Sequence, residues 1–466
     1  MNLRRVFWGI SLSVLTVASG WAVQAPRAAV APPVQTTPPT DPDLAADCNN
    51  ITPRGNGRSD HKAISNCLCT QRVARLTAGT FVLKQPVTFP RKAKTPDPAN
   101  CKFSDPPAVT LTGQGSQTVV TIASGCVFPS DVNNANATSP VLDDSGPAGA
   151  ATITNFTLDL SNLQQSCSPN RAGNFAIRVE NAPGTEVGKL TIRGSLGGGA
   201  STMGGIQLIN SPNSRVHDNV ITDIGYATRA GASSADAEAI QIGNSGTTQV
   251  TGNRITHVAF GIEVNNYFGP GYDGDSSGST VLNNTILGSS HVTSCGPTSC
   301  IGGRAFKMQG FPSAPVLRKL TVSNNTACDF GGMTQNGQLL VNTSGLDLIG
   351  VQDSTFTGNV IDSIGKNAKC GTQPSAAEFG LQLRPVLTDS VKTPAQPLVP
   401  SRNNTFTNNY FRSGCGGPGC GASCTGKCDS NGCADVNFNA QLNGNASQVG
   451  LSSGAPGSND FRNCRP

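Results

Sequence analysis

Short stretches in which hydrophobic and variable residues alternate recur through the middle of the chain. In each stretch, a small or polar residue is followed by an apolar, a variable and a second apolar position. This period of two is typical of a strand with one buried face. Seven stretches share the pattern: 176–179, 205–208, 239–242, 261–264, 305–308, 338–341 and 380–383.

A second unit, built on an asparagine, follows most of these stretches. The asparagines are Asn219, Asn253, Asn284, Asn325, Asn359 and Asn409. Copies of the first unit recur after as few as 22 residues (241 to 263) and as many as 44 (263 to 307). The shorter interval is about what three short strands and their turns require. A leucine-rich repeat would keep a regular, leucine-dominated period of about 20–29 residues. The pattern instead predicts a parallel β-helix, with the asparagines stacked at one corner of successive turns.

The start of the repeating region carries further motifs. A loop at Gly55–Asp60 leads into a short apolar-faced segment, and β-rich stretches follow at 76–83 and 109–115. This order resembles the opening of the pectate lyase-like superfamily of right-handed parallel β-helices, with Ala78 and Phe81 departing from the usual Pro-x-Gly-x-Tyr strand. The resemblance implies an all-β chain, folded as a single right-handed parallel β-helix with a short N-terminal capping helix. That superfamily contains lyases, hydrolases, epimerases, esterases and non-catalytic adhesins, so the resemblance implies no single activity.

The two ends of the chain differ from the repeats. Arg4 and Arg5 precede an apolar stretch, and Val23–Ala25 offers a small-residue cleavage site, as in a secretory signal peptide. No later run reaches the roughly 18 apolar residues of a membrane span. We therefore expect a secreted protein, extracellular or periplasmic. The predicted divisions are a signal peptide (1–25), a Pro/Ala/Thr-rich linker (26–47), the β-helix with its cap (48–411) and a Cys-rich C-terminal cap or tail (412–466).

Cysteine and charge content narrow the class of protein. Sixteen cysteines all follow residue 25, which indicates an oxidising compartment and disulfides. Zinc held by the closely spaced cysteines of the tail is the alternative. The chain has 33 basic and 28 acidic residues. Without Arg4 and Arg5 the balance is 31 against 28, or +3, which is too weak to indicate nucleic-acid binding.

Stacked turns about 4.8 Å apart would align the variable positions on the outer face. The first outward column contains Arg178, Gln207, Gln241, Glu263, Lys307, Leu340 and Gln382. The second, two residues further on, contains Glu180, Ile209, Gly243, Asn265, Gln309, Asn342 and Arg384. The middle of this face is polar and rich in amides, so an extended polymer would meet hydrogen-bond partners at regular spacing. We expect a polysaccharide to bind there, through Arg178, Gln241, Asn265, Arg304 and Gln309.

Three charged residues are candidates for chemistry. Lys307 and Glu263 are neighbours in the first column, Lys307 as a candidate base and Glu263 as a candidate acid or metal ligand. The alternative is a surface ion pair between adjacent turns, worth about 0–1 kcal/mol. Glu238 replaces an inward residue that is Phe or Gly in other copies, so it is either partnered, by Asp236 or Arg304, or at the rim of a site.

The loop after the Glu263 strand supplies candidate ligands. Asp273 and Asp275 are separated by one glycine and are candidate calcium ligands. Tyr267 and Tyr272 are candidate stacking surfaces for sugar rings. The alternative is a solvated, glycine-rich loop tip.

Together these residues favour an exported lyase or epimerase acting on a uronate-containing polysaccharide. Such chemistry needs a base near the C5 proton and a cation that neutralises the carboxylate. Lys307 would be the base, with Glu263 and the two loop aspartates supporting calcium. Arg304 or Arg178 would bind the carboxylate of the uronate sugar. The alternatives are a non-catalytic, glycan-binding or structural protein of the cell surface or matrix, and an assembly component that docks through its Cys-rich tail.

Overall fold

The structure, a computed structural model, places a defined part of the chain within one compact unit, Pro42–Pro466. The described residues are 47–55, 60–97, 101–123, 141–144, 149–162, 174–194, 203–224, 238–258, 260–266, 274–289, 303–311, 315–328, 334–335, 338–339, 343–364, 378–384, 401–413 and 433–437. In these ranges the chain forms one helix, α1 (His61–Gln71), and otherwise strands and turns. No helix in this part of the chain is long and apolar enough to cross a membrane.

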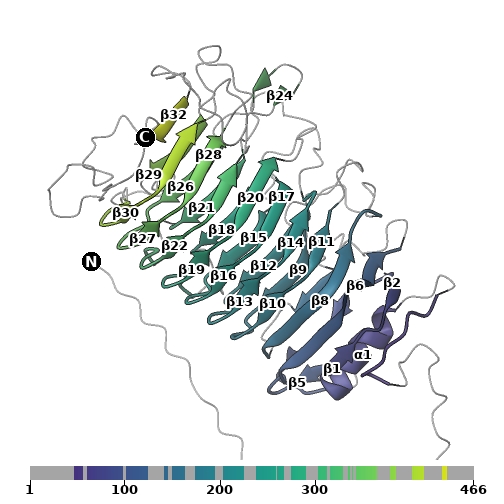
Figure 1. Ribbon diagram of the computed structural model, residues 1–466. Coiled ribbons are helices and arrows are strands. Elements are labelled where there is room, and N and C mark those ends of the chain that lie inside the picture. Colours follow the sequence, from purple (N-terminus) through teal and green to yellow (C-terminus); the bar gives the residue numbers. More distant parts are fainter. Residues whose placement is uncertain are drawn as a thin grey trace, which may run out of the picture. The chain divides into compact units, whose positions relative to one another are not determined.

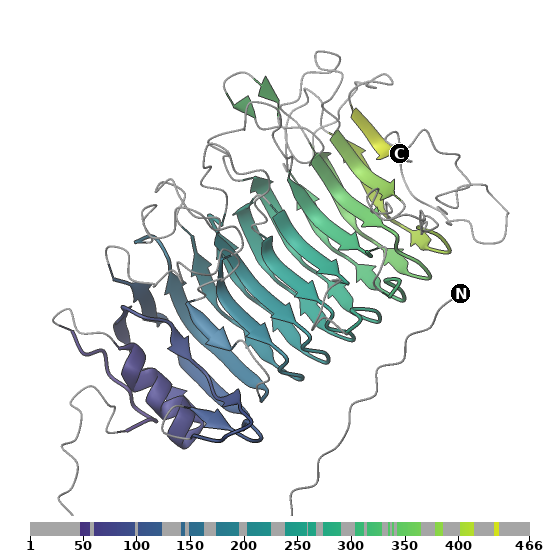
Figure 2. The same ribbon diagram turned by 180° about the vertical axis from the view of Figure 1, so that it is seen from behind.

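From β9 to β31, each coil contributes one strand to a ten-stranded sheet and two shorter strands to an 18-stranded sheet (Figures 1 and 2). Neighbouring strands pair in parallel in both sheets. In order, the ten-stranded sheet contains β3 (Val87–Thr88), β7 (Leu142–Asp144), β9 (Asn174–Glu180), β12 (Met203–Ile209), β15 (Glu238–Gly243), β18 (Phe260–Asn265), β21 (Arg304–Gln309), β26 (Thr343–Ile349), β29 (Glu378–Arg384) and β32 (Cys433–Asn437).

The 18-stranded sheet begins with four strands at the N-terminal end and continues as two series. The first four are β1 (Val73–Arg75), β2 (Gly79–Leu83), β6 (Val109–Ile122) and β8 (Ala151–Asp159). One series is β10 (Glu186–Gly188), β13 (Arg215–His217), β16 (Gln249–Thr251), β19 (Thr280–Leu282), β22 (Thr321–Ser323), β27 (Thr355–Thr357) and β30 (Thr405–Thr407). The other is β11 (Thr191–Arg193), β14 (Val220–Thr222), β17 (Arg254–Val258), β20 (Thr285–Ser289), β23 (Thr326–Cys328), β28 (Val360–Ile364) and β31 (Tyr410–Ser413).

The core lies between the sheets and follows the period-two pattern. In the ten-stranded sheet, one apolar position is in register from coil to coil and is buried at each step. Its members are Ile177, Ile206, Ile240, Ile262, Phe306, Leu346 and Leu381. No coil could bury this face alone, so the stacked coils share one core. The predicted all-β parallel β-helix is confirmed.

The asparagines form a buried ladder at the turn between the two short strands of each coil. The amide Nδ2 of Asn253 donates to Oδ1 of Asn284 at 2.9 Å, and its backbone N–H donates to the same oxygen at 3.0 Å. Asn284 repeats both bonds with Asn325. Each side chain therefore satisfies donors of the preceding coil, which is the stacking that the sequence predicts.

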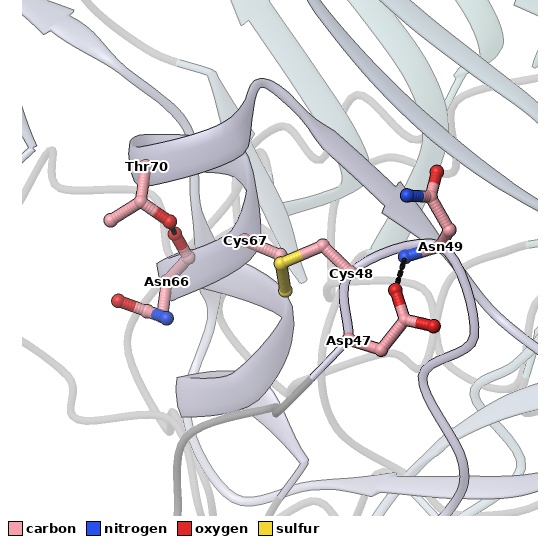
Figure 3. The surroundings of a disulfide bond; sticks show 6 residues. All are labelled: Asp47, Cys48, Asn49, Asn66, Cys67 and Thr70. Atoms are coloured by element: carbon pink, nitrogen blue, oxygen red, sulfur yellow. Dashed lines mark hydrogen bonds between the residues drawn. A yellow bond between two sulfur atoms is a disulfide. The ribbon is translucent and has the colours of Figure 1, made fainter. Parts of the chain in front are cut away.

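Helix α1 covers the N-terminal end of the stacked coils (Figure 1). It buries Ala63, Ile64, Cys67 and Leu68 as one apolar stripe. A disulfide joins Cys67 to Cys48 just before the first coil (Figure 3).

A second disulfide, Cys69–Cys101, ties the end of the helix to a later loop. Disulfides are thus confirmed in the N-terminal group. The C-terminal cysteines before Cys433, and Cys464, lie outside the described residues.

Two minor pairings complete the fold, and one of them corrects the sequence analysis. β4 (Arg91–Lys92) pairs in parallel with β5 (Lys102–Phe103). β24 (Thr334–Gln335) and β25 (Gln338–Leu339) form an antiparallel pair, so Gln338 and Leu339, the described part of the predicted stretch 338–341, do not belong to the ten-stranded sheet. β26, which begins at Thr343, takes its place, because the sequence after the hairpin has the same alternation.

Candidate functional site

The outward column of the ten-stranded sheet is in register as predicted, with one exchange. Lys307 pairs with Asp347 of β26, not with Leu340, which lies outside the described residues. The aligned residues are Arg178, Gln207, Gln241, Glu263, Lys307, Asp347 and Gln382. Beside them, Asn265 pairs with Gln309 in the second column. Asp347 is therefore a member of the site that the sequence analysis misses.

Glu238 lies at the start of β15, where it pairs in register with Phe260, and it is 0% exposed. Phe260 pairs in turn with Arg304, which forms an ion pair with the outward Asp347. Glu238 also contributes to the lowering of the Glu263 pKa, so the two side chains lie near each other.

The carboxylates of this face are buried, which differs from the expected surface ion pair. In the Lys307–Glu263 pair, the side chain of Glu263 is 4% exposed and that of Lys307 is 14% exposed. In the Arg304–Asp347 pair, the values are 0% for Asp347 and 15% for Arg304. In both pairs the cation is the accessible partner.

Glu263 is the centre of a hydrogen-bond network. Its Oε1 accepts from Lys307 Nζ at 3.0 Å and from Asn265 Nδ2 at 2.7 Å. Burial alone would raise the pKa of Glu263, but the Lys307 charge and hydrogen bonds from Glu238, Asn265 and Lys307 outweigh burial and hold this pKa below its ordinary value. Glu263 is therefore ionised within a nearly dry network.

The flanking polar residues are also paired. Arg304 lies 5.8 Å from the ring centroid of Phe260, in addition to its ion pair with Asp347. Arg178 contacts Glu180 at 3.2 Å on its own strand. Gln207 Nε2 donates to Gln241 Oε1 at 2.5 Å across adjacent coils. The structure therefore aligns the predicted residues of the two columns except Leu340 and Asn342, which lie outside the described residues and whose places are taken by Asp347 and Ile349. Arg304 forms its ion pair with Asp347.

The predicted calcium loop is only partly described. Asp275 is exposed, and its Oδ1 accepts from Asn266 Nδ2, from the Ser277 backbone N–H and from the Ser277 hydroxyl. These bonds fix a turn. Among the described residues, no group of three or more metal-ligating side chains is arranged to hold an ion. The remaining candidates of this loop, Tyr267, Tyr272 and Asp273, lie outside the described residues, as does Asp236.

No protein-family model matches the chain, and no curated protein matches it in sequence. Solved structures similar to it include PfbA, a surface adhesin of Streptococcus pneumoniae, at 13% identity and a TM-score of 0.44 over 77% of this chain and 76% of that one. The A-module of the Azotobacter vinelandii mannuronan C-5 epimerase AlgE4 is 13% identical, with a TM-score of 0.37 over 77% and 86% of the two chains. A rhamnogalacturonan lyase is 12% identical, with a TM-score of 0.37 over 73% and 75%. The parallel strand register itself establishes the parallel β-helix fold.

Proposed function

We propose that this protein is exported and acts on a uronate-containing polysaccharide, as a lyase or an epimerase. One observation carries the proposal. At the centre of the ten-stranded sheet's outer face, the side chains of Lys307 and Arg304 are 14% and 15% exposed, while their partners Glu263 and Asp347 are buried. A glycan that binds to this face would therefore contact cations that are held in place by buried carboxylates. Cations attract the carboxylate of an acidic sugar.

The spacing of the face suits a polymer. The candidate groups lie on successive parallel strands, which are about 4.8 Å apart. Gln309 and Arg178 flank the central cations on this face and are half-buried. A chain laid across the coils would contact several strands and would meet hydrogen-bond donors on β9, from Arg178, and on β21, from Arg304, Lys307 and Gln309.

The chemistry follows from what a uronate reaction requires. Removal of the C5 proton needs a base, and the adjacent carboxylate must be neutralised for the resulting carbanion to form. We assign the sugar carboxylate to Arg304 and removal of the C5 proton to Lys307, which first passes its own proton to Glu263 Oε1, 3.0 Å away. In elimination, the C5–H electron pair forms the new C4–C5 double bond, and the C4–O bond breaks with its electrons on the leaving oxygen, which takes up a proton from water. In epimerisation, water returns a proton to C5 from the opposite face.

Two variants of Lys307 test this assignment. Lys307→Ala should abolish the ultraviolet absorbance of unsaturated ends formed from polygalacturonate, alginate or related polyuronates. Lys307→Arg keeps the charge but removes the base, because arginine does not lose its proton in proteins. It should therefore still bind the polymer and form no product. Arg254→Ala, an exposed residue of β17 on the other sheet, is the matched control.

The assay should be run with and without calcium, and epimerisation followed by NMR of the product. Product formation by Lys307→Arg at the wild-type rate would refute the role of Lys307 as base. A wild-type protein that neither binds nor converts any polyuronate would refute the proposal as a whole.

A second candidate is a non-catalytic glycan-binding protein. It is favoured by the closed network, in which Glu263 already accepts from Lys307 and Asn265. A rigid stack of coils can bind a glycan without cutting it. Binding on a glycan array without product from any member of a broad polysaccharide panel would favour this function over the first.

A further inference from the structure

Arg304 lies along the outer face of the ten-stranded sheet because its ion-pair partner is not its neighbour in register. Arg304 of β21 is in register with Ser344 of β26, whereas the carboxylate that it contacts is Asp347, three residues further along β26. The atoms in contact are Arg304 Nε and Asp347 Oδ2, 2.6 Å apart. The pair is therefore diagonal, and the arginine side chain reaches along the sheet to form it.

The groups around this guanidinium are buried and come from the strands on both sides of β21. Asp347 is 0% exposed, and the ring centroid of Phe260 of β18 lies 5.8 Å from Arg304 Cζ. Next to Asp347 in register is Gln382 of β29, whose Oε1 accepts from the Ser344 hydroxyl at 3.0 Å. Arg304 is thus held between neighbours that are themselves fixed in the sheet.

The contact with Asp347 leaves most of the donors of Arg304 for a ligand. A guanidinium carries five N–H donors, four of them on the two Nη nitrogens. Arg304 Nε is buried, and it contacts Asp347 as an ion pair without a hydrogen bond. Within the described ranges, no hydrogen bond involves either Nη nitrogen. This edge can pair with a carboxylate through two parallel hydrogen bonds.

We propose that Asp347 is a positioning residue that holds Arg304 in the orientation that binds the carboxylate of a uronate sugar, and that this pair selects acidic glycans over their neutral esters. An arginine that is already held in its binding orientation loses less side-chain freedom when the ligand arrives. The inference rests on the proposed function, because it concerns the group that Arg304 would bind there.

Lys307 is the other cation through which Asp347 could act. The two residues are neighbours in register, but the ion pair of Lys307 is with Glu263, at 3.0 Å. If Asp347 acts through Arg304, its effect on binding must disappear once Arg304 is replaced. If it acts through Lys307, the effect must remain.

The sign of one substitution separates positioning from simple charge. Asp347→Asn keeps the shape of the side chain and removes a negative charge from the binding face. By charge alone, a polyanion would then bind more tightly. Loss of positioning should instead weaken binding about tenfold, the value of roughly one hydrogen bond to a charged group. Calorimetric titration with polygalacturonate and with alginate measures the affinity, and the esterified, uncharged form of each polymer should bind the wild type and Asp347→Asn alike.

Further variants show whether the effect passes through Arg304. Arg304→Gln should lose affinity for the acidic polymers, and Arg304→Gln combined with Asp347→Asn should bind as Arg304→Gln does alone. The double variant leaves no unpaired charge in the sheet, and urea unfolding of each variant checks that it is folded. Phe260→Leu removes the ring without changing any charge and should also weaken binding of the acidic polymers only. Asp353→Asn breaks an exposed pair with Arg318 outside the ten-stranded sheet and is the matched control, with unchanged affinity expected.

The outcomes distinguish this inference from the proposed function. Equal or tighter binding of the acidic polymers by Asp347→Asn would overturn the inference and leave the proposed function in place. An equal loss for acidic and esterified polymers, or a loss that persists without Arg304, would overturn it as well. If the wild type binds neither polygalacturonate nor alginate, the proposed function is wrong for these polymers and the inference is wrong with it.

Discussion

Asp144 tests whether a carboxyl group buried inside the coil is neutral or charged. It is the last residue of β7 and pairs with Val179, whose side chain lies in the core. Asp144 is itself 1% exposed, and within the described ranges neither of its oxygens has a hydrogen-bond partner. Burial, reinforced by the neighbouring charge of Asp143 and opposed by that of Arg91, raises the pKa of Asp144 well above its ordinary value.

The direction of the pH effect follows from this shift. Below about pH 3.9, Asp144 carries its proton in both the folded and the unfolded chain, so its titration does not change the free energy of unfolding. As the pH rises, the unfolded chain loses the proton first, and stability falls until the pH reaches the raised pKa of the folded state. Each unit of the shift is worth about 1.4 kcal/mol. Asp144→Asn does not titrate, so its stability relative to the wild type should increase steadily from about pH 4 to neutral pH.

Urea unfolding at a series of pH values checks the expectation. Asp143→Asn is the control, because Asp143 faces outward and pairs with the half-exposed Arg91 at 2.5 Å. That change should stay within about 1 kcal/mol. A wild type whose stability, relative to Asp144→Asn, stays level or rises between pH 4 and pH 7 would show that the carboxyl is charged in the fold, and the account of burial given above would be wrong.

Two further changes probe the architecture. Asn284→Ala removes the oxygen that accepts from the backbone and side-chain N–H groups of Asn253, and it removes the donor to Asn325; all these groups are buried. The free energy of unfolding, measured in urea, should fall by about 2–4 kcal/mol. The neighbouring Thr285→Ala should change it little. Serine at both Cys48 and Cys67 opens a loop with a sequence separation of 19 and should lower stability by about 3 kcal/mol, whereas an unchanged unfolding midpoint would show that α1 needs no covalent link.

The repeat could be predicted from the sequence because its signal is local and recurs. Alternation of period two fixes which residues face the core, and parallel stacking then aligns equivalent positions of every coil. Glu263, Lys307 and Gln241 are neighbours in the fold for this reason alone. The asparagine ladder follows from the same repetition.

The prediction failed where the alternation is ambiguous. Gln338–Leu339 and the start of β26 both alternate, and only the pairing of whole strands decides between them. The burial of the outward carboxylates, by contrast, depends on the whole tertiary structure and no local pattern encodes it.

The asparagine ladder also bears on how such a chain can grow. The same side-chain hydrogen bond, from Nδ2 to Oδ1, links Asn219 to Asn253 and Asn253 to Asn284, although 34 residues separate the first pair and 31 the second. The corner thus tolerates connections of unequal length without loss of its hydrogen bonds. A duplicated coil would bring its own asparagine and dock onto its neighbours through identical contacts, so molecules of this design can lengthen by whole units during evolution while variation is confined to the loops.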